Sequence, residues 1–167
     1  GRDKDYNEIR VHDIDKDQSG WIVFCKALPS TKIEALVLSD IGMGPLGLTT
    51  LAKFTPDSTA MTEIRLDGNP ITGSKYKADG SGNRLKEYGV EEYDCDPSGL
   101  VTLLEAMKSS AVSKLSVSDC DIGAKGLMMS APLISAIAAL SEVNLSTNKC
   151  FGSKPDPANR YKPPVHD

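Results

Sequence analysis

The amino-acid sequence predicts an α/β fold of stacked repeats, with short parallel strands on one side and helices on the other. The first observation is an internal duplication. When the numbering is offset by 79, residues 17–20 fall on 96–99 and residues 63–66 fall on 142–145. The second is a shorter motif, apolar-xx-apolar-x-apolar, that recurs within each copy. A unit of this kind cannot bury its apolar edge alone, so successive units are expected to stack.

The short motif begins at residues 6, 33, 61, 85, 112 and 140, which defines about six units. The units that begin at 6 and 85 follow it less closely than the other four. The ninth position of the motif alternates between Ile41 or Cys120 and Asn69 or Asn148. We expect the two asparagines to satisfy backbone groups of adjacent coils, because buried polar side chains are normally hydrogen-bonded.

This motif resembles the leucine-rich repeat family, and the long, helix-containing units of two alternating types resemble its ribonuclease-inhibitor-like subfamily. The resemblance covers roughly residues 6 to 151. It implies a leucine-rich-repeat solenoid, a right-handed horseshoe with strands on the concave face and helices on the convex face, in a domain spanning residues 1–154. It also implies a role in protein–protein interaction, because such proteins act as scaffolds, inhibitors and regulators through the concave face.

The elements of the first copy follow from local patterns. A strand is expected over residues 6–14, then a turn in which Asp17 or Ser19 caps a helix whose apolar residues recur at helical spacing. A strand over 35–38 precedes a helix that begins at Pro45, where the missing N–H of proline costs nothing. A strand over 63–66 comes next, and the glycine-rich residues 72–84 are interpreted as an exposed loop that replaces a helix.

The second copy repeats this order. A helix carries the apolar residues from Leu100 to Met107, and a strand covers 114–117. A second helix follows Gly123, with a kink or restart at Pro132, and a strand covers 142–145. The tail over 155–167 contains four prolines and cannot form a helix or an interior strand, so we interpret it as an end cap or linker.

Acidic residues recur along the strands predicted to line the concave face. One column comprises Asp13, Asp40, Asp67, Glu92 and Asp119, and a second comprises Glu8, Glu63, Glu87 and Glu142, with Arg10 and Arg65 between them. Stacked like charges repel one another, so the band costs stability. We hypothesise that it binds a basic surface of another protein. The alternative is a solubilising face without a ligand, since charge runs are usually solvated.

Three acids at alternate positions, Asp13, Asp15 and Asp17, resemble the start of a calcium-binding loop. The remainder of the pattern fails, because Gln18 stands at the sixth position and Phe24 at the twelfth. Turn formation and helix capping explain the same residues, so the metal remains a weak alternative.

Net charge, hydrophobicity and cysteine content argue against several classes of partner and site. A net charge of -4 and a pI near 5.2 argue against a nucleic-acid partner. No stretch is long and apolar enough for membrane insertion. The four cysteines occupy apolar positions, which favours reduced core thiols over disulfides or metal ligands. That cysteine usage and the absence of a secretory pattern favour a cytoplasmic location.

Catalysis has little support in the sequence. The two histidines, His12 and His166, are far apart, and common catalytic and nucleotide-binding motifs are absent. We therefore expect no enzyme and no cofactor. The main prediction is an interaction module that binds through its acidic concave face. The alternative is a structural subunit built permanently into a larger assembly through its edges or its convex helices.

Overall fold

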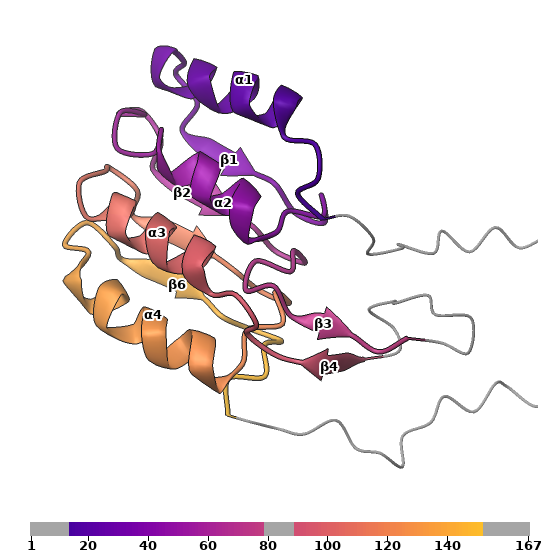
Figure 1. Cartoon of the computed structure of the whole chain (residues 1–167). Coiled ribbons are helices and arrows are strands. Elements are labelled where there is room, and N and C mark those ends of the chain that lie inside the picture. Colours follow the sequence, from indigo (N-terminus) through magenta and orange to yellow (C-terminus); the bar gives the residue numbers. More distant parts are fainter. Residues whose placement is uncertain (1–13, 79–88, 152–167) are drawn as a thin grey trace, which may run out of the picture.

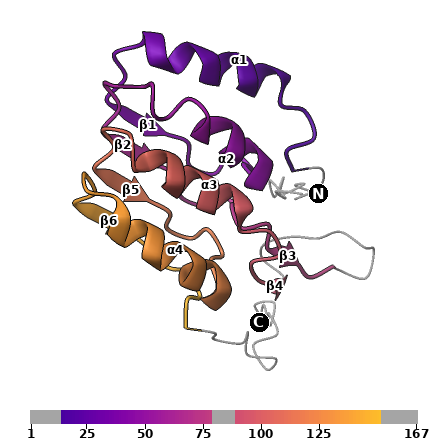
Figure 2. The ribbon, with the colours of Figure 1, turned by 60° about the vertical axis from the view of Figure 1, so that its left-hand side comes forward.

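The computed structural model describes residues 14–78 and 89–151 of the chain. Four strands form a parallel sheet in chain order: β1 (Ala35–Val37), β2 (Glu63–Arg65), β5 (Lys114–Ser116) and β6 (Glu142–Asn144). Within the described residues there are four α-helices: α1 (Ser19–Ala27), α2 (Pro45–Ala52), α3 (Ser98–Met107) and α4 (Ala124–Ala136). A short 3-10 helix, η1 (Leu28–Ser30), follows α1. The helices lie in the same order on one side of the sheet (Figures 1 and 2), so the predicted α/β class is confirmed.

The core lies between the sheet and the helices. The middle residue of each strand points toward the helices, as the alternation of side chains along a strand requires. Leu36, Ile64 and Leu115 are buried there, and they pack with leucines of α2 and α3 in one continuous cluster. Each fully buried aliphatic side chain contributes about 1.5–3 kcal/mol to stability. The apolar positions of the repeat motif therefore form the main stabilising contact between successive elements.

Asn69 satisfies the backbone of the neighbouring turn, as predicted. Its Oδ1 accepts hydrogen bonds from the N–H groups of Ile41 (3.1 Å) and Met43 (2.9 Å). Its Nδ2 donates to the carbonyl oxygens of Leu38 (2.7 Å) and Leu66 (2.8 Å). Asn148, its counterpart in the second copy, makes the four equivalent bonds, to Cys120, Ile122, Val117 and Leu145. The structural role expected for both asparagines is confirmed.

The duplication extends to unusual backbone conformations. Four pairs of described residues at equivalent places in the two copies both adopt positive φ: Asp15 and Asp94, Asp40 and Asp119, Gly42 and Asp121, and Gly68 and Thr147. A left-handed conformation costs a residue other than glycine about 1–2 kcal/mol. Asp15 and Asp40 bear that cost in the first copy, as Asp94 and Asp119 do in the second, whereas the first copy avoids it with glycine at Gly42 and Gly68. The two halves therefore share their backbone path as well as their apolar pattern.

The prediction of an exposed loop over residues 72–84 is wrong for the first part of this segment. Lys75–Tyr76 form strand β3, which pairs antiparallel with β4 (Val90–Glu92). The side chains of Thr72, Ser74 and Tyr76 are buried. The Tyr76 hydroxyl donates to the Asp121 carboxylate over 2.7 Å, and the Ser74 hydroxyl donates to the Asp121 carbonyl over 2.9 Å. These contacts anchor the segment. Residues 79–84 lie outside the described part of the chain.

The unit that begins at residue 85 contributes α3 but no strand to the parallel sheet. Its strand β4 pairs with β3, and the pair projects from the side of the molecule (Figure 1). As a result β2 pairs directly with β5, with Glu63 opposite Lys114. The predicted strand over 6–14 lies outside the described residues except for Ile14, and the tail over 155–167 lies outside them entirely.

Local signals for the helices are largely confirmed. The Asp17 carboxylate accepts a hydrogen bond from the Ser19 N–H at the start of α1, over 2.9 Å. Pro45 occupies the first turn of α2. Pro132 lies inside α4, and the helix continues through it to Ala136 without the predicted restart. In the described part of the chain, no helix is long and apolar enough to cross a membrane.

The cysteines follow the apolar positions of the motif. Cys25 and Cys120 are buried, whereas Cys95 and Cys150 are half-buried. Burial raises the pKa of the Cys25 thiol to about 11. A thiol with such a pKa is protonated at neutral pH and therefore a poor nucleophile, because the thiolate is the reactive form.

Gly99 allows α2 and α3 to pack closely. A Cβ placed on Gly99 would clash with the Pro45 carbonyl oxygen and would lie 2.7 Å from the Pro45 Cα. At Gly20, the same position of the first copy, an added Cβ would meet nothing within 4 Å. The close approach of α2 and α3 therefore requires glycine at position 99. Position 20 in the first copy has no such requirement.

We expect Gly99→Ala to lower the free energy of unfolding by about 2 kcal/mol, because the added methyl group forces α2 and α3 apart. Gly20→Ala should raise it by about 0.5–1 kcal/mol, because alanine favours a helix over glycine. Urea unfolding of both variants in dilute solution, followed by circular dichroism, checks the pair. Equal destabilisation by the two substitutions would contradict the close contact at Gly99.

Candidate functional site

The candidate site is the face of the parallel sheet that points away from the helices. The first and third residue of each strand alternate with the buried middle residue and therefore point outward. Across the sheet they form two rows, one of Ala35, Glu63, Lys114 and Glu142 and the other of Val37, Arg65, Ser116 and Asn144. We call these eight residues, together with Asp67, the open face. This face contains a shallow hollow of about 170 Å³, which is lined by Leu115 and by seven of these nine residues. Ala35 and Val37 are not part of its lining.

Charges on the open face are arranged in contacting pairs. The Arg65 guanidinium donates to the Glu63 carboxylate on the same strand, which raises the pKa of Arg65. The Lys114 ammonium lies 3.8 Å from the Glu142 carboxylate on the neighbouring strand. Exposed pairs of this kind contribute about 0–1 kcal/mol to stability. An incoming charged group can therefore replace either partner at little cost.

Asp67 is held more firmly than the other acids of this face. Its Oδ1 accepts hydrogen bonds from the Ser116 hydroxyl over 2.5 Å and from the Ser118 N–H over 2.8 Å. Asn144 in turn donates to the Ser116 hydroxyl over 3.0 Å. This chain of bonds runs from β2 across β5 to β6, so it fixes the position of a carboxylate on the floor of the hollow.

The predicted acidic columns are only partly assembled. Glu63 and Glu142 share one row, but Lys114 lies between them and breaks the run of like charge. Asp40 and Asp119 follow β1 and β5 at equivalent positions with positive φ. Asp67 lies one residue earlier in the register, because Gly68 occupies the equivalent position on its strand. Three carboxylates and two cations line the hollow, so its charge is mixed.

Glu92 lies away from the open face. It is on β4, where its carboxylate accepts a hydrogen bond from Lys75 over 3.0 Å. This bond lowers the pKa of Glu92 and raises the pKa of Lys75. Four other predicted residues, Glu8, Arg10, Asp13 and Glu87, lie outside the described part of the chain.

The acids proposed as a weak calcium site bind backbone groups instead. Asp15 accepts from the N–H groups of Gly44 (3.1 Å) and Leu46 (2.8 Å) at the start of α2. Asp17 accepts from Ser19 at the start of α1. Asp13 lies outside the described residues. Among the residues that are described, no group of three or more His, Cys, Asp or Glu is placed to hold a metal ion.

The same arrangement recurs in the second copy. Asp94 accepts from the N–H groups of Gly123 (3.0 Å) and Gly126 (2.8 Å) at the start of α4, and Asp96 accepts from Ser98 (3.1 Å). The acids at alternate positions therefore bind helix N-termini in both copies. Asp15 and Asp94, the middle acid of each set, reach the helix of the following unit.

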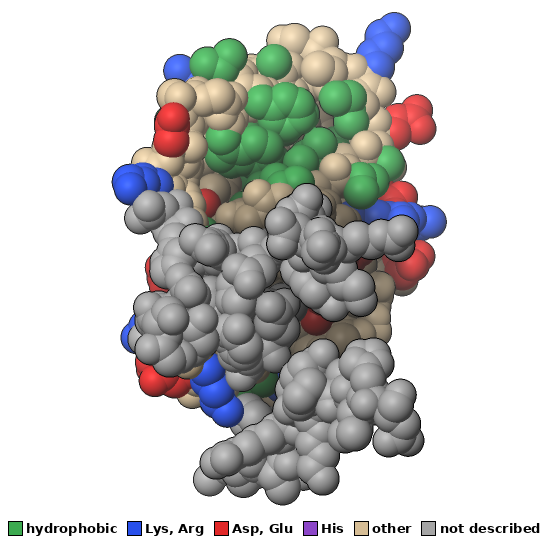
Figure 3. Space-filling view, turned by 90° about the vertical axis from the view of Figure 1, so that its right-hand side faces the viewer, with side chains coloured by type: hydrophobic (Ala, Val, Ile, Leu, Met, Phe, Trp, Pro, Cys, Tyr) green, Lys and Arg blue, Asp and Glu red, His purple; other side chains and the backbone are tan. Residues whose placement is uncertain are grey.

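A larger hollow of about 550 Å³ lies between the loop at Ile14, the start of α2 and strand β3. Pro45, Pro70 and Tyr76 contribute apolar surface to it, and the two nearby acids, Asp15 and Asp96, serve as helix caps. Figure 3 shows hydrophobic side chains gathered on the side of the molecule where β3 and β4 project. The surface of this hollow is therefore mainly apolar.

Lys114, Ser116 and Asn144 are not among the candidate residues predicted from the sequence, although strand alternation already places them on the same face as Glu63 and Glu142. The offset between the copies places Lys114 on Ala35 and Ser116 on Val37. The charge of a position therefore differs between the copies, and only the register between strands shows which side chains become neighbours.

Comparison with models of known protein families finds no family that matches this chain, and comparison with curated proteins finds no match either.

Proposed function

We propose that this chain is a leucine-rich-repeat solenoid of the ribonuclease-inhibitor-like type, and that its open face binds a basic surface of a partner protein. The order of the strands and the two asparagine networks support the stacked architecture. In this proposal the open face is the concave face of the horseshoe and the helices form the convex face. The chain acts through binding, with no reaction of its own.

The observation that carries the binding proposal is the set of carboxylates on a sheet face that no helix among residues 14–78 and 89–151 covers. Glu63, Asp67 and Glu142 line one hollow, and Asp40 and Asp119 follow the strands beside it. An arginine or lysine of a partner can replace Arg65 or Lys114 in its weak surface pair. It would also meet Asp67, whose position is fixed by the bonds from β5. Charge complementarity of this kind contributes to specificity and to the association rate.

A cross-linking experiment tests which face binds. A photo-reactive amino acid is introduced at Asn144 on the open face or at Thr102 on the exposed side of α3, and each protein is irradiated in extract of the source cell. We expect a discrete adduct from position 144 and none from position 102. A discrete adduct from position 102 alone would contradict binding through the open face.

The partner captured in this way then allows a quantitative prediction. We expect Glu63→Gln together with Glu142→Gln to weaken its affinity by about five- to tenfold, because both carboxylates face the incoming cation. The matched control is Glu105→Gln on α3, a surface glutamate paired with Lys108 away from the open face. The affinity of the unmodified chain should also fall as salt concentration rises. Affinity that does not change with salt would refute the electrostatic mechanism.

The second candidate function is a structural subunit of a larger assembly. It is favoured by the apolar side chains exposed on the two outermost helices, which include Phe24 on α1 and Met128 on α4.

A further inference from the structure

The two ends of the described structure are copies of surfaces that are joined in its middle. Under the same offset, α1 corresponds to α3 and α2 corresponds to α4, while β1 corresponds to β5 and β2 to β6. In the middle of the molecule, α2 packs on α3 and β2 pairs with β5. No described element covers the outer side of α4 and β6, which is thus a second copy of one half of this contact. The outer side of α1 and β1, which no described element covers either, is a second copy of the other half.

On α1 the uncovered surface is apolar at the positions that α3 uses to contact α2. Gly99 touches Pro45 of α2, and Leu103, one helical turn later, is fully buried. The equivalent residues of α1 are Gly20, which has open space around it, and Phe24, which is 40% exposed. Val23 is 68% exposed, and its copy Thr102 is exposed as well, so this position lies outside the contact.

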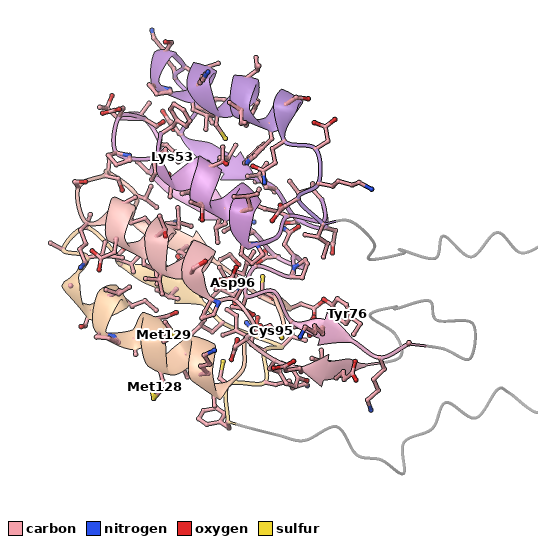
Figure 4. All side chains as sticks on the ribbon, viewed as in Figure 1. Lys53, Tyr76, Cys95, Asp96, Met128 and Met129 are labelled. Atoms are coloured by element: carbon pink, nitrogen blue, oxygen red, sulfur yellow. The ribbon has the colours of Figure 1, made fainter. Side chains whose placement is uncertain are left out.

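On α4 the uncovered surface is apolar at the positions that α2 turns toward α3. Ala52 of α2 is 3% exposed, whereas its copy Ala131 on α4 is exposed. Thr49 of α2 is half-buried, whereas its copy Met128 is 70% exposed. Figure 4 shows Met128 on the side of α4 that faces away from α3. A solvent-exposed methionine at the copy of a covered position indicates a surface suited to a helix neighbour.

The strand edges match in the same way. At the central contact, the N–H groups of Leu66 and Gly68 donate to the carbonyl oxygens of Ser116 and Ser118 over 2.8 and 2.9 Å. The copies of these donors are Leu145 and Thr147 on the outer edge of β6, and the copies of these acceptors are Val37 and Ser39 at the outer edge of β1. A parallel edge strand directs such groups outward and can accept another strand.

We propose that this chain associates head to tail with a second copy of itself, with β6 and α4 of one molecule against β1 and α1 of the next. The contact reproduces the β2–β5 pairing and the α2–α3 packing, with Gly20 and Phe24 meeting the α4 surface around Met128. Because the two surfaces differ, the contact is heterologous, and further copies can add at both ends unless the ring closes. This association uses the helix and strand edges and leaves the open face accessible.

Two substitutions at exposed positions test the proposal in the full chain. Phe24→Glu blocks the α1 surface, and Met128→Glu blocks the α4 surface. The matched controls are Val23→Glu, at a position of α1 whose copy Thr102 stays exposed beside α2, and Leu46→Glu, at a residue of α2 that is 57% exposed. Circular dichroism verifies that all four variants keep the fold. Sedimentation equilibrium from micromolar to millimolar concentration then measures the mass.

We expect the mass of the unmodified chain to rise above 17.9 kDa with concentration. Phe24→Glu and Met128→Glu should each weaken association by about tenfold or more, since each places a charge in an apolar contact, and both controls should behave like the unmodified chain. An equimolar mixture of the two blocked variants should form a one-to-one dimer and nothing larger, because one intact α4 surface meets one intact α1 surface.

Three results would overturn the proposal. The first is an unmodified chain that stays monomeric throughout the range, which would assign the uncovered surfaces to other segments or to another protein. The second is association that persists unchanged in both blocked variants. The third is association that one substitution abolishes and the other leaves unchanged, since a contact between two identical surfaces would behave in that way.

Discussion

Replacing Asn69 by alanine should lower the free energy of unfolding by about 4 kcal/mol. The Asn69 side chain is fully buried, and it accepts from two backbone N–H groups and donates to two carbonyl oxygens. Alanine would leave these groups without their partner in a buried turn, where each unsatisfied group costs about 1–3 kcal/mol. Equilibrium unfolding in guanidinium chloride, monitored by circular dichroism, measures the change.

The duplication supplies the control. Asn148 makes the four equivalent bonds but is half-buried at the end of the described array, so water can replace part of what alanine removes. We expect Asn148→Ala to cost less than half as much as Asn69→Ala. Asn144→Ala, at an exposed residue of the open face, should change stability by less than about 0.5 kcal/mol. Equal losses at 69 and 148 would show that burial does not set the size of the effect.

Replacing Asp94 by alanine should lower the free energy of unfolding by about 3 kcal/mol. Asp94 is 1% exposed, and its two carboxylate oxygens accept from Gly123 and Gly126 at the start of α4. Alanine would leave both N–H groups unsatisfied, and it would have to adopt a φ of 54° without a side chain that favours the left-handed region. Thermal unfolding followed by calorimetry is the appropriate measurement.

Asp15 is the matched position for this experiment. It accepts from Gly44 and Leu46 in the same way, but its side chain is half-buried. Asp15 also adopts a positive φ, of 62°, so burial is the main difference between the two positions. We therefore expect Asp15→Ala to cost about 1–2 kcal/mol, because water can replace part of the lost helix cap. Asp94→Asn should recover part of the stability, because asparagine tolerates positive φ and keeps one acceptor oxygen. If Asp94→Ala were no worse than Asp15→Ala, the buried cap would not have the role described.

Much of the fold could be predicted because its signals are local and occur twice. The apolar spacing around Leu100 and Leu104 predicts a helix, and the alternation around Ile64 and Leu115 predicts short strands. The asparagine at the ninth position predicts a side chain that forms hydrogen bonds with backbone groups. Each of these signals depends on residues within one turn or one strand, and its recurrence in the other copy reduces the chance that the pattern is accidental.

The open face was less predictable. Its members follow from strand alternation, but their neighbours depend on register. Lys114 lies between Glu63 and Glu142 because β2 pairs directly with β5. Glu92 was expected in the acidic column and lies instead on β4 beside Lys75, because its strand pairs with β3. No local pattern distinguishes a strand that joins the sheet from one that pairs elsewhere.

The amino-acid sequence by itself determined the repeat, the order of strands and helices, and the positions of the two asparagines that bind the backbone, because short-range spacing sets which side of each element is apolar. Only the tertiary structure decided that residues 75–76 and 90–92 leave the sheet. It also decided that Asp15 and Asp94 cap helices one unit away, and that Gly99 rather than Gly20 lies against another helix. These outcomes depend on contacts between residues distant in the chain, and their energies exist only once the elements have packed.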